Sequence, residues 1–81
     1  MVELYEPVNV WVLFAKTQPQ PFAFIWKNRT IKVTAVNLIH TSREGKSPLY
    51  HYSISSGDNF YQLCFDTQNL KWHLEAVEEG E

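Results

Sequence analysis

The sequence has a single cysteine, only three glycines and no strong excess of either charge. One cysteine cannot form a disulfide within the chain, so we expect a cytoplasmic protein. There is no C-x-x-C or H-x-x-x-H spacing and no glycine-rich phosphate loop, so the sequence predicts neither a metal site nor a cofactor. The longest uncharged run near the start, 7–15, is well short of the ~20 apolar residues that span a bilayer. We therefore expect no membrane segment, and no signal peptide, because no basic region precedes this run.

The remaining composition is that of one small folded domain. The chain has 81 residues, of which 44% are hydrophobic and 15% aromatic, and a disordered segment would be poor in both. We expect a single domain over 1–81, with an ordered core at about 7–77 and an acidic tail over 78–81. The net charge is −2, but all seven basic residues lie in the region 7–74. The acidic total argues mildly against nucleic-acid binding, whereas the basic body leaves it open.

Apolar residues alternate with a period of two along almost the whole chain, which is typical of strands. The alternation predicts six strands, over 8–14, 22–27, 30–39, 50–54, 60–65 and 70–76. Turn residues separate them, including the proline-containing break over 17–21, a tight turn at Asn28 and a long polar loop over 41–48. A shift of phase after Val33 predicts a β-bulge over 34–37. The fold expected is all-β: a small, six-stranded, mostly antiparallel, bent barrel or sandwich similar to SH3-like barrels.

The inward side chains of these strands form the expected core. They are Val10, Val12, Phe14, Phe24, Trp26, Ile31, Val33, Val36, Tyr52, Ile54, Leu63, Phe65, Trp72 and Leu74. Both faces of the first and fifth expected strands are apolar, so a curled sheet or a partner must cover the second face.

A linear pattern of aromatic and turn residues runs through most of the chain. It reads Pro21-x-x-Phe24-x-Trp26-x-x-Arg29-x-x-x-Val33-x-x-Val36, followed by Tyr52, Leu63-x-x-Asp66 and Trp72-x-Leu74. This pattern resembles a family of small bacterial all-β domains of unknown function. Similar domains occur at the C-terminal end of Y-family-polymerase-like DNA repair proteins. The resemblance implies a fold and an association with DNA repair. The chain departs from the family at the hairpin turn, where Asn28 replaces the usual glycine, and after the third strand, where Ile39 and His40 replace the usual tryptophan.

Candidate catalytic residues are few. His51 and His73 alternate with apolar neighbours and so face solvent, and they would come together only if their strands were neighbours. Cys64 lies between apolar residues without a neighbouring base, which favours a buried, unreactive thiol. Asp58 and Asp66 fall in turns, where local hydrogen bonds explain them. The sequence therefore predicts no catalytic residue, and we expect that the protein is not an enzyme.

Basic and aromatic residues gather on parts of the chain outside the expected core. The candidate nucleic-acid or partner surface comprises Trp11, Lys27, Arg29, Lys32, Arg43 and Lys46. The function expected is a non-catalytic interaction domain that binds a protein partner or a second copy of itself. The alternative is an accessory domain that binds single-stranded nucleic acid through base stacking beside basic side chains.

Overall fold

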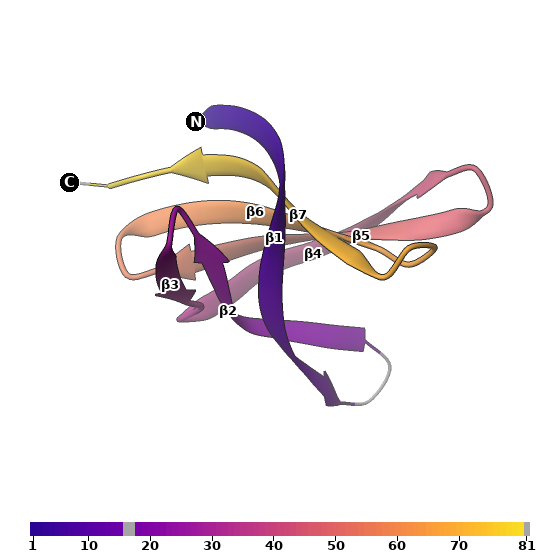
Figure 1. Ribbon diagram of the computed structural model, residues 1–81, viewed down its shortest axis with the longest axis horizontal. Helices are drawn as coiled ribbons and strands as arrows, with labels where there is room; N and C mark the ends of the chain where they lie inside the picture. Colours follow the sequence, from indigo (N-terminus) through magenta and orange to yellow (C-terminus); the bar gives the residue numbers. More distant parts are fainter. Residues whose placement is uncertain (16–17, 81) are drawn as a thin grey trace.

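The computed structural model describes residues 1–15 and 18–80 and is built from one seven-stranded sheet (Figure 1). The strands are β1 (Val2–Ala15), β2 (Gln18–Trp26), β3 (Arg29–Lys32), β4 (Ala35–Glu44), β5 (Ser47–Ser56), β6 (Asn59–Asp66) and β7 (Lys71–Glu78). The all-β prediction is confirmed, but the expected number of six strands is wrong. Among the described residues there is no helix that could cross a membrane.

The order of the strands forces the sheet to curl. The order is β3-β2-β1-β7-β6-β5-β4, and every neighbouring pair is antiparallel. The two edge strands, β3 and β4, follow one another in the chain with only Val33 and Thr34 between them. The Val33 N–H donates to the Phe22 carbonyl at 3.0 Å, and the Thr34 N–H donates to the Ser55 carbonyl at 2.8 Å. Because so short a link joins opposite edges, the sheet bends into a half-barrel (Figure 1).

Tight turns set the register of three hairpins. Lys27 and Asn28 both have positive φ, 52° and 60°, as a type I′ turn requires, which confirms the expected turn at Asn28. Gly45 and Gly57 have φ of 67° and 59° at the first central position of their turns, where glycine is favoured. Two-residue turns match the twist of the paired strands, so these hairpins fix which residues face one another.

The additional strand arises where the sequence predicted one strand and a loop. The segment expected to be a single strand over 30–39 is divided at Val33 and Thr34, where the chain crosses between the sheet edges. The expected bulge is present, as a register shift between Val36 and Leu38 in β4. Most of the expected loop over 41–48 is paired strand, because ladder hydrogen bonds join backbone groups and tolerate polar side chains at an exposed edge. Of the expected break over 17–21, residue 17 lies outside the described residues, and Pro19 and Pro21 belong to β2.

The core lies on the inner face of the curled sheet. Nine of the expected core residues are buried: Phe24, Trp26, Ile31, Tyr52, Ile54, Leu63, Phe65, Trp72 and Leu74. Val10, Val12 and Val33 are partly buried and pack against this cluster. Two expectations are wrong, since Phe14 is 76% exposed and Val36 is 40% exposed. Phe14 is next to the β1–β2 connection and Val36 is on edge strand β4, where fewer neighbours cover a side chain.

Candidate functional site

A row of metal-ligating and titratable side chains crosses the outer face of the sheet, opposite the core. Ladder pairing places His40 of β4 beside His51 of β5, His51 beside Cys64 of β6, and Cys64 beside His73 of β7. These four residues are all the histidines and the only cysteine of the chain. Paired residues on one face of an antiparallel sheet have Cβ atoms about 4.5–5.5 Å apart, so the row is continuous. We call these residues, together with Glu75, the outer-face row.

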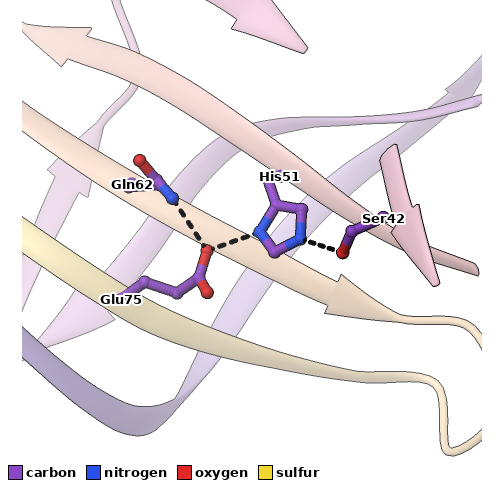
Figure 2. Close-up of polar contacts among 4 residues, drawn as sticks. All are labelled: Ser42, His51, Gln62 and Glu75. Atoms are coloured by element: carbon purple, nitrogen blue, oxygen red, sulfur yellow. Dashed lines mark hydrogen bonds and ion pairs between the residues drawn. The ribbon is translucent and has the colours of Figure 1, made fainter. Parts of the chain in front are cut away.

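His51 is the centre of a hydrogen-bond network within this row (Figure 2). Its Nδ1 lies 2.8 Å from Glu75 Oε1, and its Nε2 lies 2.7 Å from Ser42 Oγ. Gln62 Nε2 donates to the same Glu75 oxygen at 3.1 Å. With Nδ1–H donating to the carboxylate, Nε2 accepts the proton of the Ser42 hydroxyl. The side chains of His51 and Glu75 are only 12% and 20% exposed, so the pair is well shielded from solvent.

A β-bulge brings Glu75 into the network. Gln62 pairs with Ala76 and Leu63 pairs with Leu74, so Glu75 is the extra residue on β7. A bulge bends its strand and redirects a side chain, here across β6 toward His51 of β5. The backbone thus positions this carboxylate.

Two aromatic stacks flank the network. The rings of His40 and His51 stack at 4.6 Å between centroids, and the rings of Tyr5 and His73 stack at 4.1 Å. His73 Nδ1 is buried and makes no hydrogen bond within the part of the chain that the structure describes. Buried polar atoms are nearly always paired, so this nitrogen calls for an explanation.

The network has the composition of two known kinds of site. Ser42, His51 and Glu75 follow the hydroxyl–imidazole–carboxylate order of acyl-transfer triads, in which the imidazole takes the hydroxyl proton. Acyl transfer also needs oxyanion donors and a substrate pocket, and three hollows formed by the described residues are all lined by other side chains than Ser42, His51 and Glu75. His51, Cys64 and Glu75 alternatively supply nitrogen, sulfur and oxygen atoms within 4.8 Å of one another, as metal ligands do.

Sequence reasoning missed this arrangement, although a signal was present. It placed His51 and His73 on the outer face and left open whether their strands were neighbours. Their strands lie on either side of β6, and Cys64 comes between the two histidines. Counting residues outward from the turns at 57–58 and 67–70 would have aligned these side chains. Cys64 is buried as expected, at 1% exposed, but it belongs to the outer face. The roles of Ser42, Gln62 and Glu75 carried no local signal.

The residues of the predicted basic and aromatic surface fall into separate groups. Trp11 and Lys32 line one hollow of about 320 Å³, together with Phe22, Ala23, Thr30 and Val33. Lys27 Nζ lies 4.6 Å from the centre of the Trp26 ring, and Arg29 pairs with Glu79 at 3.9 Å. Lys27 and Arg29 both lie at the β2–β3 turn.

Arg43 and Lys46 lie at the β4–β5 hairpin, on the opposite edge strand, where Arg43 donates to the Lys46 carbonyl at 2.9 Å. Figure 1 shows this hairpin projecting away from the β2–β3 hairpin. The structure therefore brings Trp11 and Lys32 together and leaves Arg43 and Lys46 apart from them.

Comparison with known proteins returned no match to a family model, a curated protein or a solved structure. The resemblance to small bacterial all-β domains thus stays a prediction from the sequence.

Proposed function

We propose that this chain is a small non-catalytic interaction domain that binds an extended segment of a partner protein along the β3 edge. The observation that carries the proposal is the hollow beside β3, which we call the β3 hollow. Two exposed aromatic side chains line it, Trp11 at 45% and Phe22 at 52% exposed. Leu13, also exposed and two residues along β1 from Trp11, takes the same face of the strand and extends the apolar surface. Clusters of exposed aromatic residues mark binding surfaces, because leaving them in water has a free-energy cost.

The sheet edge supports the choice of an extended segment. β3 is the last strand of the sheet, so in the strand order it has a ladder partner on one side only. A peptide that adds as a further strand gains main-chain hydrogen bonds, and its alternate side chains point into a neighbouring hollow. Thr30 and Lys32 of β3 line the β3 hollow, so edge and hollow form one surface.

The charges around this edge favour an acidic segment. Lys27, Arg29 and Lys32 all lie on or beside β3 and are exposed, and one carboxylate, that of Glu79, lies 3.9 Å from Arg29. Opposite charges across an interface steer association and select the partner. The partner segment is therefore apolar at one set of alternate positions and acidic at the other.

Single-stranded nucleic acid is the second candidate, since Trp11 and Phe22 beside Lys32 are also the elements of a base-stacking site. Nucleic-acid contacts weaken steeply with salt, which distinguishes this candidate from an apolar protein contact.

Fluorescence anisotropy tests both candidates on the full chain. The probes are a labelled short peptide in which valine alternates with aspartate, the same peptide with lysine for aspartate, and a labelled oligothymidylate. We expect the acidic peptide to bind and the basic one to bind at least ~10-fold more weakly, a difference of about 1.4 kcal/mol. Trp11→Ser and Lys32→Glu should weaken binding, whereas Leu38→Ser, an exposed apolar residue on the other edge strand, is the matched control.

Three results would overturn the proposal. The acidic peptide does not bind, or the Trp11→Ser variant binds it as tightly as the unmodified chain. The third is that Leu38→Ser loses as much affinity for the peptide as Trp11→Ser does. If only the oligonucleotide binds, if its binding weakens with salt, and if Trp11→Ser and Lys32→Glu both lose it, the nucleic-acid candidate replaces the proposal. A dimer by light scattering that Trp11→Ser dissociates would identify a second copy of the chain as the bound segment.

A further inference from the structure

We propose that the outer-face row binds a transition-metal ion of the zinc class, with His51, Cys64 and Glu75 as its ligands. Each residue offers one ligand atom, and the three atoms lie within 4.8 Å of one another. They come from the adjacent strands β5, β6 and β7, joined by continuous ladders. The strands therefore hold the three side chains together without a dedicated loop.

The donor set matches the chemistry of zinc. Imidazole nitrogen, thiolate sulfur and carboxylate oxygen are its usual ligands, with bonds of about 2.0–2.3 Å, which places the ligand atoms of a tetrahedral site about 3.3–3.8 Å apart. To reach that geometry, side-chain rotations must shorten the wider separations, which are at most 4.8 Å, by up to about 1.5 Å. They must also widen the 2.8 Å contact between His51 Nδ1 and Glu75 Oε1 enough for the ion to enter. Calcium and magnesium are disfavoured, because they require a set of oxygen ligands.

The surrounding hydrogen bonds suit a ligand set of this kind. When a metal takes Nδ1 of His51, the proton moves to Nε2, which then donates to Ser42 Oγ, 2.7 Å away. Gln62 already donates to Glu75 Oε1 at 3.1 Å, so the second carboxylate oxygen is available to the ion. Partners that orient a ligating imidazole and carboxylate are a regular feature of protein metal sites.

His73 provides an independent indication. It lies directly across the β6–β7 ladder from Cys64, and its buried Nδ1 has no hydrogen-bond partner among the described residues. Three protein ligands leave the fourth position of a tetrahedral ion to water. We assign this water to the side of His73, where it would give the His73 nitrogen the partner that it lacks among the described residues.

Cobalt titration of the full chain tests the proposal, because tetrahedral Co²⁺ replaces zinc and is coloured. We expect one equivalent to bind, with a thiolate-to-metal charge-transfer band and intense visible bands, and we expect Zn²⁺ to displace it. Cys64→Ser should abolish the charge-transfer band. Glu75→Gln and His51→Ala should each weaken binding at least ~10-fold, because each removes a ligand. Circular dichroism checks that every variant is folded.

His40→Asn is the matched control. His40 is in the same row and stacks on His51, but it lies outside the set of close ligand atoms. Its loss should change the affinity less than ~2-fold, whereas His73→Ala should give an intermediate loss of ~3- to 10-fold. The proposal is overturned if no charge-transfer band appears at ~0.1 mM Co²⁺, a concentration corresponding to about −5.5 kcal/mol of binding free energy. It is also overturned if Cys64→Ser or Glu75→Gln binds as tightly as the unmodified chain, or if His40→Asn alone loses the ion.

Discussion

Replacing Tyr52 by phenylalanine tests how the inner face of the half-barrel is held together. Tyr52 of β5 is fully buried, and its hydroxyl donates to the backbone carbonyl of Pro19 in β2. This hydrogen bond crosses the interior between strands that are not neighbours in the sheet. The substitution removes only the hydroxyl and leaves the buried Pro19 carbonyl without this donor.

The expected loss at neutral pH is about 1–3 kcal/mol, the usual cost of leaving a buried acceptor unpaired. That is a large share of the roughly 4–12 kcal/mol of unfolding free energy expected for a domain of this size. Burial, with a smaller contribution from the nearby charge of Tyr50, raises the pKa of Tyr52 to about 12. The unfolded chain releases this proton near pH 10, so the folded state binds it more tightly.

The stability that this proton contributes is therefore complete below about pH 10 and is lost between about pH 10 and 12. At pH 11 the loss amounts to about 1.4 kcal/mol, and at pH 12 or above it approaches about 2.7 kcal/mol. Tyr52→Phe lacks the group and should not show this decline. The difference in free energy of unfolding between Tyr52→Phe and the unmodified chain should thus be smaller at pH 11 than at pH 8.

Urea unfolding followed by tryptophan fluorescence, at pH 8 and pH 11 for both proteins, measures this difference. Comparing the two proteins at each pH cancels the titration of every other tyrosine and lysine. The reasoning is refuted if Tyr52→Phe is within about 0.5 kcal/mol of the unmodified chain at pH 8. It is equally refuted if the deficit is the same at both pH values.

Three further predictions concern single positions. Trp72→Ala should cost about 3–5 kcal/mol, because it empties part of the core between Tyr52 and Phe65; denaturation showing a loss under about 1 kcal/mol would place the ring at the surface. The hydrogen bond from the Gln68 backbone N–H is the chief cause of the lowered pKa of Asp66. The ionised carboxylate therefore stabilises the folded chain above about pH 4, and this stabilisation is lost on acidification. Asp66→Ala should lower the melting temperature at pH 7, with the difference closing toward pH 2, and a constant difference would contradict this. Leu70 is exposed and has a φ of 57°, a left-handed backbone conformation that asparagine adopts at a lower cost than leucine. Leu70→Asn should therefore raise the free energy of unfolding by about 0.5–1 kcal/mol, and a decrease measured by calorimetry would contradict this prediction.

Alternation along the sequence was a good guide to the inner face, because a period of two fixes which side of a strand each residue takes. It identified Phe24, Tyr52, Leu63 and Leu74, all completely buried. It failed at Phe14, since alternation describes the face of a strand and not whether another element covers that face. It also failed to separate β3 from β4, because the crossing at Val33 and Thr34 depends on where the sheet edges meet.

The outer-face row was less accessible from the sequence. Cys64 and His51 could be aligned from the turn at Gly57, since a two-residue hairpin determines its register. Glu75 could not, because a one-residue bulge on β7 brings it beside His51 and nothing in the local sequence marks that bulge. Side chains that meet through an irregularity of the backbone have to be found in three dimensions.

The pairing of β1 with β7 also has a kinetic consequence. Short connections join consecutive strands within two groups, β1 to β3 and β4 to β7. In each group, neighbouring strands can therefore pair as soon as the turns between them form. Joining them requires opposite ends of the chain to meet, and closing so long a loop has an entropic cost before any contact compensates for it. We therefore expect the pairing of β1 with β7 to limit the folding rate. A shift of register between these two strands would slow folding more than a shift of register between two strands of the same group.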